Sequence, residues 1–429
     1  MSHASRHPSP GNGSPFNRSV QHDTKRAAIL SQAAVLFNSQ GARATTLTQI
    51  AEGLGLTKTS LYNYVKTKEE LIYQCYMAAL EHYHDTLDRI EAEQGSAVDR
   101  ISWFYLQQYE DWLAARDGRG YYSAALLEIA ALKGSHRSDV ESLYLSMFKR
   151  IRGYLRDGIA DGSVRDCDTI SAARGLLGAI PWTFGWLRGL SDEEVRDAAQ
   201  AALDILHHGF AAGSAHYEFA ESLEPLADDT LLAQGQRPGQ LKKELFYRAA
   251  SWHFNRKGFN GASLDEIAER VEASKGAFYY HISNKEGLLL NCHLYSLDMI
   301  DAIQGEAGSL ASNGAEKLEY VCRRLFVVQN SEQGPLIRHR TLTALPQRQR
   351  RQVIKRRRAS NQRFGEFLRA GVADGSVRQL DLTVAENLLG GILNAAMDMQ
   401  AWRQIDNLEL AAIDYLDLFF NGLLPRQPQ

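Results

Sequence analysis

Residues 47–71 read LTQIAEGLGLTKTSLYNYVKTKEEL, and residues 264–288 read LDEIAERVEASKGAFYYHISNKEGL. The two stretches align without a gap at a constant offset of 217 residues. Over the longer ranges 37–71 and 254–288, twelve of 35 positions are identical. An ungapped match of this length within one chain indicates an internal duplication.

A second pair of segments extends the duplication toward the C-terminus. LRDGIADGSVR at 155–165 returns as LRAGVADGSVR at 368–378, with nine of 11 positions identical at an offset of 213. Because both pairs occur in the same order, the chain holds two copies of a unit of roughly 200 residues, a period too long for a solenoid.

Each copy opens with the pattern of three short helical segments. Apolar residues at helical spacing predict a first helix that ends at Gly41 in copy one and at Gly258 in copy two. Hydroxyl residues are then placed to cap two further short helices: Thr46 and Thr57 in copy one, Ser263 and Ser274 in copy two. Two short helices joined by a tight turn predict a helix-turn-helix. The rest of each copy has helical periodicity and no sustained alternation, so the expected fold class is all-α.

Composition limits the class of protein. A chain of 429 residues with 44% hydrophobic content is large enough for two to four domains with proper cores. Net charge is −3, yet Asp23–Lys68 carries a local +4 and Gly239–Lys285 a local +3. Basic modules on a neutral body are typical of phosphate-contacting domains. The chain has no apolar run long enough to span a membrane, so no membrane partner is expected.

Cysteine usage and the low-complexity segments complete the outline. Four cysteines without a CxxC spacing argue against disulfides and zinc, and Cys75 and Cys292 are expected to be buried hydrophobes in a reducing bacterial cytoplasm. Residues 1–22 are predicted to be a disordered tail, and residues 218–240 a linker between the copies.

The order of the duplicated residues resembles the DNA-binding signature of the tetracycline-repressor (TetR) family. In copy one the resemblance rests on Ile50-Ala51, Gly55, Thr57-Lys58 and Lys68-Glu69, and copy two repeats it with Glu272 in the place of Gly55. If that position needs a positive φ, the non-glycine residue costs on the order of 1 kcal/mol. The later part of each copy is similar to the family only in length, helicity and the GxADGSVR turn.

The resemblance implies two tandem TetR-like units. Each would be a three-helix helix-turn-helix domain plus a helical ligand-binding and dimerisation domain. The expected boundaries are 23–70 and 71–217 in copy one, and 241–287 and 288–424 in copy two.

It also implies which residues contact DNA, and elementary physics supports the assignment. A capped helix N-terminus with a lysine in its first turn attracts phosphate, and the side chains between face base edges in the major groove. The expected backbone contacts are Thr46, Thr57, Lys58, Tyr62, Tyr64 and Lys68 in copy one and Ser263, Ser274, Lys275, Tyr279, His281 and Lys285 in copy two. The expected base-facing residues are Thr59, Ser60 and Asn63 in copy one and Gly276, Ala277 and Tyr280 in copy two.

Aromatic residues crowd the middle of copy one. In the TetR family a cavity among the central helices holds a small effector, and an aromatic lining with hydroxyls suits an apolar or planar ligand. The candidate ligand contacts are Trp103, Tyr109, Trp112, Tyr122, Tyr144, Phe148, Trp182 and Trp186. Ordinary core packing remains the alternative for each of them.

The resemblance thus implies a ligand-responsive transcriptional regulator, and a repressor is expected. Ile170–Ala212 is expected to pack on Thr383–Leu424, which would make an intramolecular pseudo-dimer on a double-stranded operator. No cofactor, metal site or catalytic residue is expected, because P-loop, GxGxxG, HExxH and GxSxG patterns are absent. A helical effector-binding module that has lost DNA binding is the second interpretation, and a helical enzyme the third. The basic run Arg348–Arg358 favours a solvated helix face over a second DNA contact.

Overall fold

Helices make up the architecture of the chain. The computed structural model describes residues 15–126, 129, 132–221, 223, 238–331, 334–397, 399 and 402–426. Within these ranges the extended pairing is limited to an isolated antiparallel bridge between Ala211 and Val377. The predicted all-α class is therefore confirmed. None of the described helices is long and apolar enough to cross a bilayer.

The two copies have the same order of helices. In copy one they are α1 (Pro15–Ala44), α2 (Leu47–Gly53), α3 (Lys58–Leu61), α4 (Lys68–Ala92), α5 (Ala97–Arg116), α6 (Gly134–Asp161), α7 (Thr169–Trp186), the 3₁₀ helix η2 (Leu187–Gly189) and α8 (Asp192–His208). In copy two they are α9 (Pro238–Gly261), α10 (Leu264–Arg270), α11 (Lys275–His281), α12 (Lys285–Ser309), α13 (Gly314–Asn330), the 3₁₀ helix η3 (His339–Ala344), α14 (Gln347–Asp374), α15 (Leu382–Ala395) and α16 (Leu408–Asn421).

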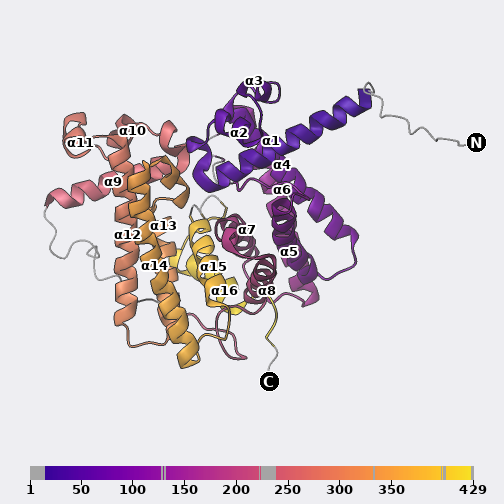
Figure 1. The fold of residues 1–429 in the computed structure, drawn as a ribbon. Coiled ribbons are helices and arrows are strands. Elements are labelled where there is room, and N and C mark those ends of the chain that lie inside the picture. The colour runs from indigo at the N-terminus through magenta and orange to yellow at the C-terminus, as the bar shows by residue number, and fades with distance from the viewer. Residues whose placement is uncertain are drawn as a thin grey trace, which may run out of the picture.

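The first three helices of each copy form a small head. Head one is built on α1–α3 and head two on α9–α11, and Figure 1 shows both heads at the same end of the molecule. The first helix of each head bends at the predicted glycine, where the backbone is left-handed: φ is 80° at Gly41 and 66° at Gly258. Glycine permits this conformation at no steric cost, so both copies turn toward the second helix at the same point.

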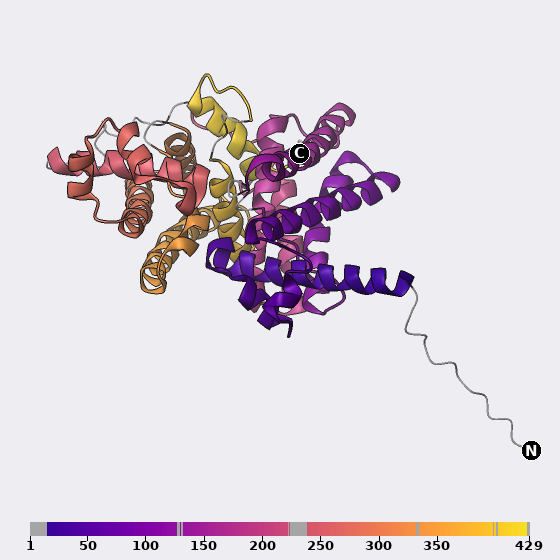
Figure 2. The ribbon, with the colours of Figure 1, turned by 90° about the horizontal axis from the view of Figure 1, so that it is seen from above.

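The predicted tail boundary at residue 22 was wrong. Helix α1 begins at Pro15, so residues 15–22 are helical, and Figure 2 shows this end of α1 projecting away from the body. Proline suits the first position of a helix, and neither glycine nor proline interrupts residues 16–40. Residues 1–14 lie outside the described residues.

The expected linker, 218–240, is anchored at its start. The Tyr217 hydroxyl donates a hydrogen bond to Glu319 Oε2 at 2.7 Å, and the Ala220 N–H donates to Glu319 Oε1 at 3.1 Å. Arg323, which is fully buried, donates to the Ala220 carbonyl at 2.6 Å and to Glu319 Oε1 at 2.7 Å. The chain therefore docks on α13 of copy two as soon as it leaves copy one. Residues 222 and 224–237 of the linker lie outside the described residues.

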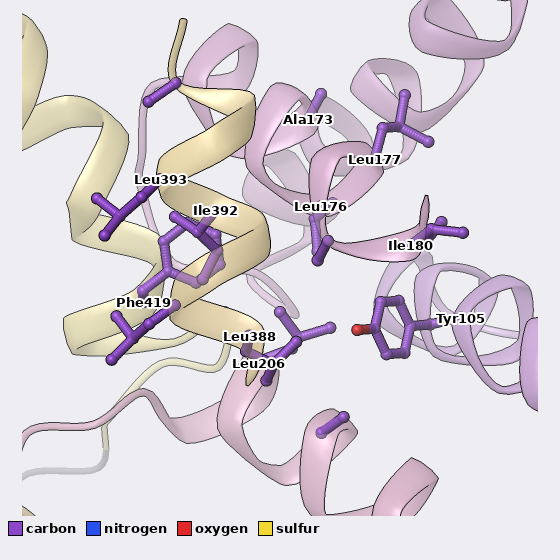
Figure 3. Close-up of a cluster of buried hydrophobic side chains, with 14 of the residues drawn as sticks. Tyr105, Ala173, Leu176, Leu177, Ile180, Leu206, Leu388, Ile392, Leu393 and Phe419 are labelled. Carbon is purple, nitrogen blue, oxygen red and sulfur yellow. The ribbon is translucent and has the colours of Figure 1, made fainter. Parts of the chain in front are cut away.

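Helices α7 and α8 of copy one pack against α15 and α16 of copy two. Aspartates cap the two central helices alike: Asp168 accepts from the Ser171 N–H at 2.7 Å at the start of α7, and Asp381 from the Val384 N–H at 2.9 Å at the start of α15. Figure 3 shows the apolar side chains that meet between the copies. They include Ala173, Leu176, Leu177, Ile180 and Leu206 from copy one and Leu388, Ile392, Leu393 and Phe419 from copy two.

The backbone contacts of this interface are reciprocal. The Phe210 N–H donates to the Phe419 carbonyl at 2.8 Å, and the Leu423 N–H donates to the Leu206 carbonyl at 2.9 Å. The donors of these two bonds are 213 residues apart in the sequence, and so are the acceptors. Each copy therefore makes the same hydrogen bond to the other. An interface of this kind is isologous in form, although both halves belong to one chain.

The arginine of each GxADGSVR turn crosses to the opposite copy. Arg165 Nε donates to the Gly422 carbonyl at 2.6 Å, and its Nη1 pairs with Asp417 at 2.6 Å. In the equivalent contact from copy two, Arg378 Nε donates to the Gly209 carbonyl at 2.6 Å, and its Nη1 pairs with Asp204 at 2.6 Å. The repeated GxADGSVR turn thus supplies a contact between the copies, made by Arg165 and Arg378 and here called the clasp.

A second contact between the copies involves the 3₁₀ helix η3. Helix η3 of copy two packs against both α1 and α9 and so lies between the two heads. At the bend of α1, a Cβ on Gly41 would lie 2.5 Å from Thr343 Oγ1, whereas a Cβ on Gly258 would meet nothing within 4 Å. Leu342 of η3 is buried in the core of head two. Head one is therefore braced against copy two, whereas among the described residues nothing lies within 4 Å of the matching position in head two.

The cysteines are buried as expected. Cys75 and Cys292 are 3% and 0% exposed, and burial raises the pKa of the Cys292 thiol to about 12. Both thiols are therefore protonated packing groups near neutral pH.

Candidate nucleic-acid interface and effector pocket

Helix α3 of head one starts with a capped, solvent-facing turn. The Thr57 hydroxyl accepts a hydrogen bond from the Ser60 N–H at 3.1 Å, which confirms the predicted N-cap. Leu61 is fully buried and anchors α3 to the head, while Ser60 is half-buried. The side chains exposed on the outer side are Lys58, Thr59 and Asn63. A helix N-terminus with a free lysine beside it is well suited to a phosphate.

The other predicted backbone contacts of head one surround this turn. The Thr46 hydroxyl and the Gln49 side chain form a reciprocal capping box at the start of α2, with distances of 3.1 Å and 2.8 Å. Tyr62 is 45% exposed, and Lys58 Nζ lies 5.8 Å from its ring centroid. Tyr64 is half-buried and stacks on His22 at 4.8 Å. The part of α1 that lies before residue 23 thus contacts the recognition segment.

Helix α11 of head two is built on the same plan. The Ser274 hydroxyl accepts from the Ala277 N–H at 3.3 Å, and Phe278 is fully buried where Leu61 lies in head one. Tyr280 is 85% exposed. Gly276 and Ala277 are exposed as well. The outer side of α11 therefore presents small apolar groups and one tyrosine, whereas head one presents the Thr59 hydroxyl on α3 and the Asn63 amide just after it.

Further predicted contacts of head two are held by internal partners. The Tyr279 hydroxyl donates to Asp265 Oδ1 at 3.2 Å, and the Ser263 hydroxyl accepts from the Asp265 N–H at 3.2 Å. His281 is half-buried, with its ring 6.0 Å from that of Phe246. The side chain of Lys275 lies outside the described residues.

The lysines that open the fourth helices bind the heads internally. Lys68 Nζ donates to the Thr45 carbonyl at 3.0 Å, and Lys285 Nζ lies 3.5 Å from the Asn260 carbonyl and 4.9 Å from the Phe259 ring centroid. These ammonium groups hold α4 and α12 to the junction before the second helix of each head. Positioning of the head is thus a role for both lysines that the sequence did not indicate.

The turn before the recognition helix differs between the heads. Gly55 has a φ of 64°, and Glu272 at the same place has a φ of 53° and is the non-glycine residue with positive φ among the described residues. This position of the turn therefore requires a positive φ in both heads. Head two meets the requirement with a glutamate, whose Cβ makes the conformation strained. Glu272 is also exposed, and it lies two residues before Ser274, the N-cap of α11.

An asparagine in each copy joins the head to the helical body. Asn38 Nδ2 donates to the Ser123 carbonyl at 2.9 Å, and Asn38 Oδ1 accepts from the Ala125 N–H at 2.8 Å. Asn255 makes the same pair of bonds with the Leu336 carbonyl at 2.8 Å and the Arg338 N–H at 2.9 Å. Sequence reasoning missed this link, although the repeated Phe-Asn pair was its signal.

A cavity of about 270 Å³ lies at this joint in copy one. It is lined by Val35, Asn38, Gln108, Asp111, Trp112, Arg116, Tyr121, Tyr122, Ser123 and Arg188, which come from α1, α5, the following loop and η2. The cavity therefore touches the first helix of head one directly.

Two charged residues of this cavity, Asp111 and Arg116, have ionisable partners. The Asp111 carboxylate lies 2.6 Å from His82 Nε2, and this hydrogen bond raises the pKa of His82 above its ordinary value. Arg116 lies 4.7 Å from the Trp112 ring centroid and forms an ion pair with Asp192. The cavity thus combines an aromatic wall with charged groups that are held by partners in the protein, a lining that suits a planar ligand.

Only part of the predicted aromatic set lies at this cavity, namely Trp112 and Tyr122. Tyr144 and Phe148 instead pack against Trp402 of copy two, at ring distances of 5.9 Å and 4.7 Å. Tyr109 is buried beside Tyr105, and Trp103 and Trp186 are half-buried elsewhere. The side chain of Trp182 lies outside the described residues. The structure therefore divides the set between a cavity, the core and the interface.

Family comparisons match both copies in tandem. The model of the N-terminal region, described as "Bacterial regulatory proteins, tetR family", matches residues 29–75 and 247–292. The model described as "Tetracyclin repressor-like, C-terminal domain" matches residues 109–210 and 311–402. Together these ranges cover more than half of the chain. The chain belongs to the tetR family of bacterial regulatory proteins. It consists of two TetR-like units in tandem and carries the helix-turn-helix of a DNA-binding regulator in each.

Individual relatives of this TetR-family chain match one copy at a time. The HTH-type transcriptional repressor KstR2 of Rhodococcus jostii is 26% identical over 190 residues, which are 44% of this chain and 92% of the repressor. The transposon Tn10 TetC protein of Escherichia coli is 36% identical over 81 residues, and the chain spans only 41% of its length. The solved structure of the ketosteroid regulator KstR2 of Mycobacterium tuberculosis is 23% identical, with a TM-score of 0.36 over 42% of this chain and 92% of that one.

Proposed function

We propose that this TetR-family regulator is a ligand-responsive repressor that reads an asymmetric operator as a covalent pseudo-dimer. The observation that carries the proposal is the presence, in one chain, of two capped recognition helices with unlike outer surfaces. Thr59 and Asn63 offer hydrogen-bonding groups in head one, where Gly276 and Tyr280 stand in head two. A protein of this kind acts on DNA and would work in the bacterial cytoplasm.

The pseudo-dimer is supported by the reciprocal contacts between the copies. The Phe210 and Leu423 N–H groups each donate a hydrogen bond to a carbonyl of the opposite copy, and Arg165 and Arg378 likewise bind the opposite copy. A covalent link makes this association intramolecular, with an effective concentration on the order of millimolar. One chain then supplies both heads that a homodimer obtains from two chains.

An operator with two unlike half-sites follows from the same observation. The symmetry of a homodimer imposes symmetry on its DNA site, but a fused pair has no such constraint. Head one is suited to read base edges through hydrogen bonds, and head two to contact a thymine methyl through its small apolar residues. The half-site centres should lie about one helical turn of DNA, or a multiple of it, apart.

Ligand response is supported by the place of the cavity in copy one. Its lining includes Val35 and Asn38 of α1, so a bound molecule would contact the helix that carries head one. Arg188 also donates to the Val35 carbonyl at 3.2 Å and ties η2 to the same helix. A ligand that fits one orientation of α1 better than another shifts the population of the two, with a reciprocal coupling of roughly 1–3 kcal/mol to DNA.

Selection of bound sequences from random duplex DNA tests the proposal. The expected consensus holds two different half-sites in fixed relative orientation. Exchange of residues 57–64 with 274–281 should then invert the preferred orientation of the site. A perfectly palindromic consensus, or an exchange that leaves the orientation unchanged, would contradict the asymmetric operator.

An effector-binding module with a lost reading head is the second candidate. The observation that favours it is confined to head two, where Glu272 strains the turn and Gly276 and Ala277 lack hydrogen-bonding side chains. If the whole chain binds duplex DNA with a salt-dependent affinity, DNA binding has not been lost in both heads. Selected sites in which only one half is specified would favour loss in head two.

A further inference from the structure

The basic run 348–358 on α14 splits into two faces. Arg350 Nη2 donates to the Thr343 carbonyl at 2.9 Å, and Arg356 pairs with Asp298 and Asp301 at 2.5 Å and 2.9 Å. Arg357 is half-buried. These three arginines face the protein. The remaining cations, Arg348, Arg351, Lys355 and Arg358, are all exposed.

These four exposed cations form one line along the helix, the α14 stripe. Their spacing of three, four and three residues places them on one side of an α-helix, opposite the fully buried Val353. The stripe is about 15 Å long, at 1.5 Å per residue. Among the residues that the structure describes, none of the four cations has a hydrogen bond or ion pair. Four like charges in a row repel each other, and no carboxylate of the described chain offsets them.

Copy one shows that the fold does not need these charges. Helix α6 is the counterpart of α14, since both end at an aspartate followed by a left-handed glycine, Gly162 or Gly375. At the offset of 213 the stripe positions are Ser135, Ser138, Ser142 and Leu145, all exposed. The same helix face is thus neutral in one copy and carries four positive charges in the other.

The stripe begins close to both heads. Helix α14 follows directly on η3, which packs against α1 of head one and α9 of head two. Figure 1 shows α14 running from the end of the molecule that carries α3 and α11 toward the opposite end. Head two is also the head whose turn presents the exposed carboxylate of Glu272 and the neutral residues Gly276 and Ala277.

We propose that the α14 stripe is an additional phosphate-binding surface, which holds the backbone of duplex DNA beside head two. The inference rests on the proposed DNA-binding function and adds to it a contact outside the two helix-turn-helices. Lysine and arginine without internal partners gain by neutralising phosphates and releasing their counterions. The contact carries affinity and no base specificity, because it reaches only the sugar-phosphate backbone. It would offset the poorer set of contacts in head two.

Copy one supplies the matched variant for the test. Arg348→Ser, Arg351→Ser, Lys355→Ser and Arg358→Leu together give α14 the side chains that α6 already carries at these positions, so the fold should be kept. Affinity for a duplex with the selected operator is measured against salt concentration, for the variant and the unchanged chain. We expect the slope of log affinity against log salt to fall by about two to four units, at roughly 0.9 per lost phosphate contact. The consensus sequence should stay the same.

Two controls separate this contact from a general effect of charge. Lys149→Ser with Arg156→Ser removes two exposed cations from α6, and Arg348→Ser with Arg351→Ser removes two from the stripe. The α6 double variant should change the salt slope by less than half as much as the stripe double variant does. The reciprocal variant, Ser135→Arg, Ser138→Arg, Ser142→Lys and Leu145→Arg, should steepen the slope by placing a stripe on α6.

The outcomes also distinguish this inference from the proposed function. If the unchanged chain selects no DNA, the proposed function fails. If it binds DNA and the four-residue variant keeps the same slope and affinity, the stripe does not contact DNA and only this inference is overturned. Loss of binding to anionic lipid vesicles in the variant, with DNA binding unchanged, would also overturn it and assign the stripe to a membrane surface.

Discussion

Glu272 holds a conformation that glycine supplies at the same turn of head one. Its φ of 53° places a side chain in the left-handed region, which costs an ordinary residue about 1–2 kcal/mol. Glu272→Gly should therefore raise the free energy of unfolding, by about 1 kcal/mol after the greater chain entropy of glycine is allowed for. Chemical denaturation with a reporter in head two measures the change.

Two further substitutions separate strain from charge at this turn. Glu272→Gln keeps the backbone strain and removes the carboxylate, so it should leave stability unchanged and raise DNA affinity. Gly55→Ala at the matched turn, where φ is 64°, should lower stability by a similar amount, about 1 kcal/mol. Equal stability of Glu272→Gly and the unchanged chain would show that head two tolerates the turn without cost.

Lys58 and Asn63 are both exposed and should affect DNA binding differently. Lys58→Ala should weaken binding to all sequences alike and reduce the salt slope by about one unit, as the loss of one phosphate contact does. Asn63→Ala should relax the preference at particular bases, by about 1–3 kcal/mol. Titrations on operator and scrambled duplexes at several salt concentrations distinguish the two. An unchanged slope for Lys58→Ala would remove α3 from the interface.

His82 makes the stability of copy one depend on pH. Its hydrogen bond to Asp111 raises the pKa of the imidazole, against the opposing effect of burial. A raised pKa in the folded state means that the charged pair contributes fully below the unfolded pKa of about 6.5. The contribution is lost as pH rises through the higher folded pKa. Melting curves should show this loss above pH 6.5 in the unchanged chain and not in Asp111→Asn.

At the scale of elements, the clasp between the copies depends on two glycines. A Cβ on Gly209 would lie 2.3 Å from the Phe420 carbonyl oxygen, and one on Gly422 would lie 2.2 Å from that of His207. Gly209→Ala should therefore force the copies apart as well as strain a φ of 72°. Gly162→Ala is the matched control, because its φ is 80° and nothing lies within 4 Å of the added carbon.

Small-angle scattering and thermal unfolding should report this difference. Gly162→Ala should cost about 1 kcal/mol of strain alone. Gly209→Ala should cost more and should expand the molecule. Equal effects of the two substitutions would show that the added carbon at residue 209 is accommodated without moving the copies apart.

Local signals predicted the elements, and distant contacts escaped prediction. Thr46, Thr57, Ser263 and Ser274 cap their helices as expected, because capping involves residues only two or three positions away. The partner of Tyr144 and Phe148 is Trp402, which no local pattern connects to them. The start of α1 at Pro15 was missed because the polar composition of residues 1–22 indicated a disordered tail.

At the scale of the whole molecule, the fused chain should remain a single species. The reciprocal contacts leave α7, α8, α15 and α16 covered within one chain, and the link keeps the copies at an effective concentration on the order of millimolar. Sedimentation should find a mass of 47.9 kDa down to nanomolar protein. A dimer of the chain that forms with rising concentration, and so carries four heads, would contradict the intramolecular arrangement.

The reciprocal form of the interface also has a consequence during translation. Copy one leaves the ribosome with α7 and α8 complete while α15 and α16 are still to be made. At about 5–20 residues per second, the repeat offset of 213 residues corresponds to a delay of about 10–40 s. During this delay the apolar face of Figure 3 has no partner on its own chain, and a self-complementary face can pair with the same face of a neighbouring nascent chain. The speed of the ribosome therefore sets how many chains close on themselves before they meet another on the same messenger.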